Sequence, residues 1–151
     1  MAVFRLRILV DYAEERSKSA AREVQRIRTK WTQEEQKKHQ LEGYLEDYRI
    51  RLNSIAAGGM SMVTMLDFRR FIAKLELAIR TQTEEIVRCK QQWEVAKKMW
   101  LEREREVKAY HLLRTRHEQA EVVKEERQDQ RLQDEFAQLM HRRQKAEQPA
   151  P

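Results

Sequence analysis

Helix-breaking residues are scarce in this sequence: it has three glycines and two prolines among 151 residues, and the first proline is Pro149. Disordered chains are also hydrophilic, but they are rich in Pro, Gly and Ser and lack regularly spaced apolar residues. Here 37% of the residues are charged, the mean hydropathy is −0.90, and apolar residues recur at regular intervals. The composition therefore predicts long helices rather than disorder or a compact globular core.

Cysteine and long apolar runs are also lacking. The single Cys89 excludes a disulfide within the chain and suits a reducing compartment. No apolar run approaches the ~20 residues that a membrane-spanning helix needs. Residues 1–10 are briefly apolar but have no long apolar centre before Asp11, so we expect no signal peptide and a soluble cytoplasmic protein.

The residue patterns of catalytic and metal sites are absent as well. Gly58-Gly59 lacks the surroundings of a phosphate-binding loop, and no two histidines lie four residues apart. The carboxylates are spread along predicted helices with no cleft to raise a pKa. We therefore expect no enzyme, no metal and no cofactor.

Charge of either sign is abundant, but neither sign dominates. The net charge of +6 arises from 31 basic and 25 acidic residues that are interspersed along the chain. This pattern favours solvated helix faces over a nucleic-acid footprint, and a basic nucleic-acid-binding hairpin is the least favoured alternative.

The adjacent glycines Gly58 and Gly59 predict where the chain reverses, because Gly costs a helix about 1 kcal/mol relative to Ala and tolerates positive φ. We predict helices over about 4–55 and 66–145 and a turn over about 56–64. Thr64 and Asp67 resemble a capping box for the second helix. The predicted fold is all-α, a single domain over 1–151: a long two-helix antiparallel coiled-coil hairpin with an overhanging C-terminal helix.

A heptad pattern defines the packed seam of this hairpin. In the first helix the a positions are Val10, Ser17, Val24, Trp31, Lys38, Leu45 and Leu52, and the d positions are Leu6, Ala13, Ala20, Ile27, Glu34, Leu41, Tyr48 and Ile55. In the second helix they are Met65, Ile72, Ile79, Ile86, Trp93, Trp100 and Val107 (a) and Phe68, Leu75, Gln82, Cys89, Ala96, Arg103 and Tyr110 (d).

Folding the chain about Met60 makes facing indices add to 120, and this register places large residues against small ones, as at Ala20 and Trp100. It also predicts Lys38 opposite Gln82, Ser17 opposite Arg103, and Trp31 opposite a buried Cys89 thiol. Glu34 falls opposite Ile86, so we expect its carboxylate to lean towards solvent. The alternative is a parallel homodimer of each helix; the hairpin predicts a monomer.

Two apolar surfaces lie outside the seam. Near the turn, the e edge is charged and the g edge carries Tyr44 and Phe71 beside Tyr48 and Leu75, which predicts an aromatic patch on one side; alternatively, these rings only thicken the seam. Beyond about residue 120 the second helix has no facing partner. There an apolar stripe recurs at helical spacing and consists of Leu132, Phe136, Leu139 and Met140.

Three segments resemble the flagellar export protein FliJ family in order and spacing. They are Tyr-Leu-Glu-Asp-Tyr-Arg at 44–49, Phe-Ile-Ala-Lys-Leu-Glu at 71–76 and Arg-Gln-Asp-Gln-Arg-Leu-Gln-Asp-Glu-Phe-Ala at 127–137. The resemblance covers about 41–143. It implies a coiled-coil stalk in flagellar type III protein export that inserts in the hexameric export ATPase (FliI) and promotes its assembly and activity.

The same resemblance implies two further kinds of partner, the export gate protein FlhA and the flagellar export chaperones that the stalk escorts. It assigns gate binding to Tyr44, Tyr48, Phe71 and Leu75, and ATPase binding to Leu132, Phe136, Leu139, Arg127 and Arg131. The implied location is cytoplasmic, peripherally associated with the cell membrane at the flagellar base. The alternative function is a generic coiled-coil scaffold or adaptor without an ATPase partner.

Overall fold

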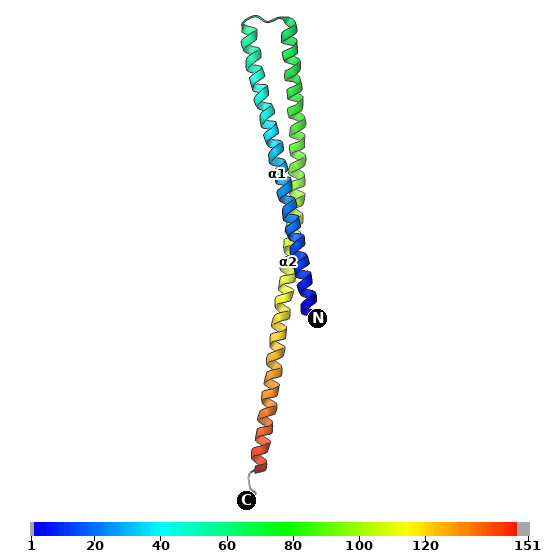
Figure 1. Ribbon diagram of the computed structural model, residues 1–151, viewed down its shortest axis with the longest axis vertical. Helices are drawn as coiled ribbons and strands as arrows, with labels where there is room; N and C mark the ends of the chain where they lie inside the picture. Colours follow the sequence, from blue (N-terminus) through cyan, green and yellow to red (C-terminus); the bar gives the residue numbers. More distant parts are fainter. Residues whose placement is uncertain (1, 148–151) are drawn as a thin grey trace. The chain divides into compact units, whose positions relative to one another are not determined.

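A computed structural model describes residues 2–147, which form two α-helices and no strand. Helix α1 spans Ala2–Ala57 and α2 spans Met62–Glu147 (Figure 1). The all-α hairpin is therefore confirmed. The chain divides into two compact units, Glu15–Glu104 and Met1–Glu14 with Arg105–Pro151. The single domain predicted over 1–151 includes Met1 and residues 148–151, which lie outside the described residues. That the whole chain forms one domain stays a prediction.

The reversal between the helices depends on Gly59. Helix α1 ends at Ala57, and the next amides bond back to it: Gly58 N to the Ile55 carbonyl at 3.1 Å and Gly59 N to the Ala56 carbonyl at 3.4 Å. Gly59 has a φ of +85°, a conformation in which an L side chain is strained. The Gly-Gly pair thus ends α1 in the way that glycine commonly ends helices.

Ser61, rather than Thr64, caps the start of α2. The Ser61 Oγ accepts a hydrogen bond from the Thr64 amide at 3.3 Å, and the Ser61 carbonyl accepts from the Met65 amide at 3.0 Å. The predicted capping box of Thr64 and Asp67 is therefore wrong. The helix begins earlier, at Met62, because Ser61 already satisfies a free first-turn amide directly after the turn.

Burial in the structure follows the predicted heptads. Every seam residue from Leu6 to Leu52 and from Met65 to Tyr110 is buried or half-buried, whereas Ile55 is exposed. Contacts across the hairpin in the unit Glu15–Glu104 join residues whose indices add to within five of 120. They include Lys30–Glu85, Trp31–Trp93, Glu34–Gln82, Tyr48–Phe71 and Arg49–Glu76. The 120 register is therefore confirmed.

The polar layer in the middle of the seam differs from the prediction. Gln82 Nε2 donates to the Glu34 carbonyl at 2.9 Å and also to the Glu34 carboxylate, and the Glu34 side chain is 12% exposed. The expectation that Glu34 leans towards solvent was wrong, because Gln82 gives its carboxylate a partner inside the seam. Lys38 lies 3.8 Å from Glu42 on its own helix, and the hydrogen bonds of Gln82 go to Glu34.

At two other predicted seam pairs the observed contact is made one or four positions along α2 from the residue directly opposite. Ser17 is buried and donates its hydroxyl to the carboxylate of Glu104, the neighbour of the predicted Arg103. Trp31 lies 5.7 Å from Trp93, ring centroid to ring centroid, while Cys89 is completely buried. The buried thiol is confirmed, and long side chains reach past the residue directly opposite.

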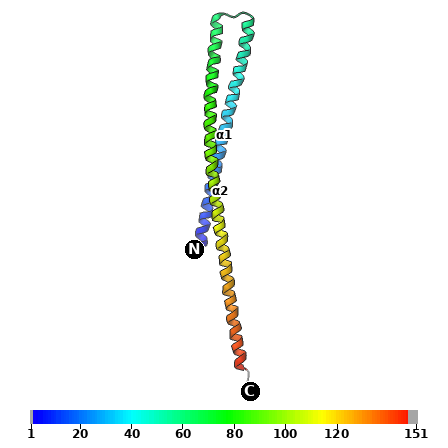
Figure 2. The ribbon, with the colours of Figure 1, turned by 180° about the vertical axis from the view of Figure 1, so that it is seen from behind.

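In the unit that holds residues 2–14 and 105–147, the start of α1 lies beside α2 (Figure 1 and, from behind, Figure 2). Val10 and Ala13 are each 1% exposed, and Glu14 Oε1 lies 2.8 Å from His111 Nε2. From Glu118 to Glu147 every described residue of α2 is exposed. The overhang is therefore helical but has no covering partner among the described residues.

Candidate protein-interaction surfaces

We call the side chains of Tyr44, Tyr48, Phe71 and Leu75 the aromatic patch. The rings of Tyr48 and Phe71 have centroids 4.5 Å apart and are tilted by 44°, and Tyr48 also lies 6.0 Å from Phe68. Tilted ring pairs at this spacing are favourable. The half-buried Tyr48 thus joins the two helices and supports Phe71 at the surface.

The members of the aromatic patch are unequally accessible. Tyr44 is 57% exposed and Phe71 is 41% exposed, whereas Leu75 is only 8% exposed and belongs to the seam. A partner could contact Tyr44 and Phe71 directly. Leu75 and the buried part of Tyr48 would not contact the partner; they would hold the rings of Tyr44 and Phe71 in position.

Charged side chains lie on both edges of the seam near the aromatic patch. On the e edge, an Arg49 guanidinium nitrogen lies 2.9 Å from Glu76 Oε1 and bridges the two helices. On the g edge, the Arg51 guanidinium carbon lies 5.6 Å from the Tyr48 ring centroid. Sequence reasoning missed Arg51, although it occupies a g position and could have been found by the same e/g comparison.

We call Leu132, Phe136 and Leu139, with the cations Arg127 and Arg131, the tail surface. The three apolar side chains are 63%, 65% and 58% exposed, and Met140 beside them is 43% exposed. Their i, i+4, i+7 spacing places them along one face of α2. Because a monomer rarely exposes a contiguous row of apolar side chains, the tail surface is a second candidate interaction site.

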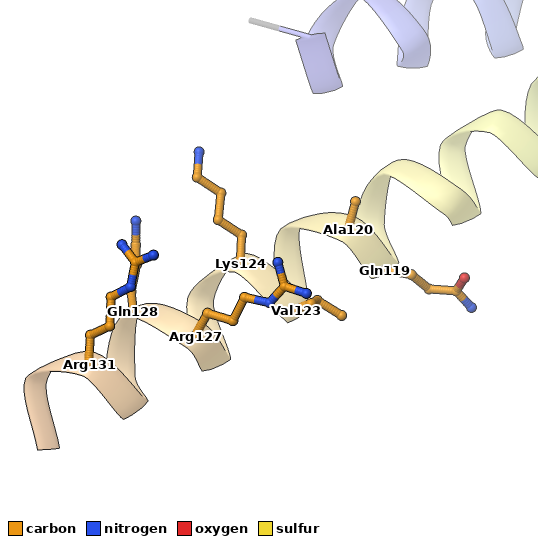
Figure 3. Close-up of a pocket in the computed structure, with 7 residues that line it drawn as sticks. All are labelled: Gln119, Ala120, Val123, Lys124, Arg127, Gln128 and Arg131. Atoms are coloured by element: carbon orange, nitrogen blue, oxygen red, sulfur yellow. The ribbon is translucent and has the colours of Figure 1, made fainter. Parts of the chain in front are cut away.

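Cations form a row on α2 next to the apolar part of the tail surface. Lys124, Arg127 and Arg131 line a shallow hollow, and Figure 3 shows their side chains extending from neighbouring turns of the helix. Spacings of three and four residues bring such side chains onto one face. This face would suit an acidic partner surface.

The carboxylates with shifted pKa values among the described residues belong to hydrogen-bonded pairs. No group of three or more His, Cys, Asp or Glu among them could hold a metal ion. Hydrogen bonds, first from Gln82 and then from Lys37, lower the pKa of Glu34, and the side-chain hydrogen bond from Arg26 lowers that of Glu23. Both shifts keep a carboxylate charged, so they serve structural pairs rather than proton transfer at neutral pH. Neither described helix contains a stretch apolar enough, over the length required, to cross a bilayer.

These features define an antiparallel coiled-coil hairpin whose distinctive parts are exposed apolar and aromatic surfaces. The sequence matches the family described as Flagellar FliJ protein over residues 1–146. It is 32% identical over 133 residues to the flagellar FliJ proteins of Escherichia coli (strain K12) and Salmonella typhi, covering 88% of this chain and 90% of each relative. The chain belongs to the FliJ family and is a component of flagellar protein export.

A solved structure supports the fold independently. A YscO homologue from Chlamydia trachomatis, CT670, superposes with a TM-score of 0.53 at 20% sequence identity, over 97% of this chain and 95% of that one. At this level of identity the likeness concerns the fold alone. It shows that a long two-helix hairpin occurs in another protein of similar extent.

Proposed function

We propose that this chain is a non-enzymatic coupling component of the flagellar type III export apparatus. In this proposal the tail surface binds the hexameric export ATPase (FliI) and promotes its assembly and activity. The aromatic patch binds the export gate protein FlhA, and the chain also escorts export chaperones. It is a cytoplasmic protein that associates peripherally with the membrane at the flagellar base.

The observation that carries the proposal is the exposure of the tail surface. Leu132, Phe136 and Leu139 lie in the part of α2 from Glu118 to Glu147, which no other described segment covers, next to the cations Arg127 and Arg131. An apolar row flanked by positive charge fits a partner that offers apolar contacts and carboxylates. Membership of the FliJ family supports an export protein as this partner.

The proposed mechanism is allosteric. The tail surface is apolar on one face and basic on another, so it makes unequal contacts with the six subunits of a surrounding ring. Unequal contacts stabilise different subunit conformations to different extents and thereby bias their nucleotide states.

The tail assignment is tested by Phe136→Ala, with Leu77→Ala as the matched control. Both side chains are exposed on α2, at 65% and 59%, and Leu77 lies outside the tail surface and the aromatic patch. We expect Phe136→Ala to weaken binding to the purified export ATPase by roughly thirtyfold, the effect of losing an interface hot spot. Both variants should keep wild-type helicity by circular dichroism. Undiminished ATPase binding by Phe136→Ala would refute the role of the tail surface.

The gate assignment is tested by combining Tyr44→Ala with Phe71→Ala. The matched control combines Val87→Ala with Val95→Ala, two side chains that are 50% and 67% exposed. We expect the aromatic variant to lose binding to the soluble domain of FlhA while its thermal midpoint stays close to that of the control. A large fall in the midpoint would instead show that the two rings hold the seam together.

A further inference from the structure

The tip of the hairpin carries exposed apolar side chains that the seam does not use. We call Ile55, Met62, Val63 and Leu66 the tip surface; they are 40%, 72%, 70% and 44% exposed. They lie in the last turn of α1 and the first turns of α2, on either side of Gly58-Gly59. Two adjacent residues, Met62 and Val63, are thus among the most exposed apolar side chains of the described chain.

Cations surround the tip surface and carboxylates are scarce. Between residues 49 and 74 the chain has five basic residues and a single acidic one, Asp67. Arg49 is paired with Glu76, whereas no carboxylate of the described residues pairs with Arg69 or Arg70. At ~1.5 Å per residue, Arg69 and Arg70 lie about 10–12 Å along α2 from its start, close to one Debye length.

We propose that the tip surface binds an anionic lipid surface. Apolar side chains of a peripheral protein enter the headgroup region by about 5–10 Å. At that depth the exposed Met62 and Val63 would lie at the acyl boundary, and Arg69 and Arg70 would lie near the lipid phosphates. Each such cation strengthens binding about fivefold at physiological salt.

The chemistry of the tip surface favours lipid over an acidic protein. Protein interfaces are anchored by Trp, Tyr and Arg in shape-complementary pockets. None of the four tip residues is aromatic. They come from the ends of two helices, and a deformable lipid surface accepts them without a matching shape.

This inference rests on the peripheral membrane association in the proposed function, for which it names a surface, and it does not depend on binding to the ATPase or to the gate protein. Vesicles of pure lipid contain neither the gate protein nor the ATPase. Loss of lipid binding and loss of binding to either protein are therefore measured separately.

The test is co-sedimentation of the full chain with vesicles of phosphatidylcholine that contain about one third phosphatidylglycerol. We expect binding that weakens as salt is raised and that is absent with pure phosphatidylcholine. Met62→Ser with Val63→Ser should lower the partition coefficient at least tenfold. Arg69→Gln with Arg70→Gln should lower it about 25-fold, since each cation contributes about fivefold.

The matched controls change the same kinds of residue away from the tip. Val87→Ser with Val95→Ser removes two exposed valines, and Lys90→Gln with Lys98→Gln removes two exposed cations. Both controls should bind vesicles like the wild type. The proposal is overturned if the wild type does not bind anionic vesicles or if the tip variants bind them as well as the wild type does. It is also overturned if the control variants lose as much vesicle binding as the tip variants.

Discussion

At the scale of single residues, the contact between Glu34 and Gln82 helps to fix the register of the hairpin. Gln82 reaches both the main-chain carbonyl and the carboxylate of Glu34 inside an otherwise largely apolar seam. A slip of one heptad would set Glu34 against Ile79 or Trp93, which offer no hydrogen bond to an anion. A charge left without partners in such surroundings costs a few kcal/mol, so this layer excludes the slipped pairings.

The same contact predicts a specific dependence of stability on pH. The hydrogen bond from Gln82, with that from Lys37, lowers the pKa of Glu34 below its ordinary value of 4.5. The stabilisation is therefore fully present above that value and is lost as the pH falls through the lower pKa of the folded state. We expect Glu34→Gln to lower stability by about 1 kcal/mol at pH 7 and to match the wild type in strong acid.

The measurement is urea unfolding of both proteins from neutral to acidic pH. Glu35→Gln is the matched control, because Glu35 is the exposed next residue and makes no contact in the seam. The control should follow the wild-type curve throughout. A difference between Glu34→Gln and the wild type that stays constant with pH would show that shape, not charge, accounts for the contact.

At the scale of elements, the two glycines of the turn have different roles. Gly59 alone has positive φ, and a Cβ added there would meet no atom within 4 Å, so any cost of substitution comes from the backbone. A Cβ added at Gly58 would lie 3.7 Å from the Ile55 carbonyl oxygen, an ordinary contact. The sequence Gly-Gly therefore includes one glycine that the turn requires and one that it does not.

This difference predicts opposite effects of the same substitution at neighbouring positions. Gly59→Ala should destabilise the chain by about 1–2 kcal/mol, the cost of a left-handed L residue. Gly58→Ala should be neutral or should stabilise by up to about 1 kcal/mol, because it restricts the unfolded chain. Thermal unfolding followed by circular dichroism compares the two, and an equal effect of both substitutions would contradict the assignment of the turn to Gly59.

At the scale of the whole molecule, the sequence predicted what depends on backbone periodicity. Burial of the seam follows from the heptads, and the accessibility of Tyr44 and Phe71 follows from comparing the two edges. It did not predict contacts that depend on the reach of long side chains, such as Gln82 to Glu34 and Ser17 to Glu104. The first joins residues four positions away from the exact facing pair, and the second joins residues one position away.

The seam also predicts how many chains associate in solution. Each helix already covers the apolar seam of the other, from Leu6 to Leu52 and from Met65 to Tyr110. A second copy of the chain therefore finds no exposed seam residues in these ranges to pack against. We therefore expect a monomer of 18.3 kDa by light scattering, and the same mass across a wide range of concentration. The parallel homodimer would give twice that mass.

The tail surface is where weak self-association would arise, because its apolar side chains have no cover among the described residues. If the mass rises at high concentration, Leu132→Ser with Phe136→Ser should restore the monomer, whereas Val87→Ser with Val95→Ser should not. A stable dimer that persists on dilution and in the tail variant would mean that the helices pair between chains. In that case the hairpin, and the register built on Glu34 and Gln82, would have to be abandoned.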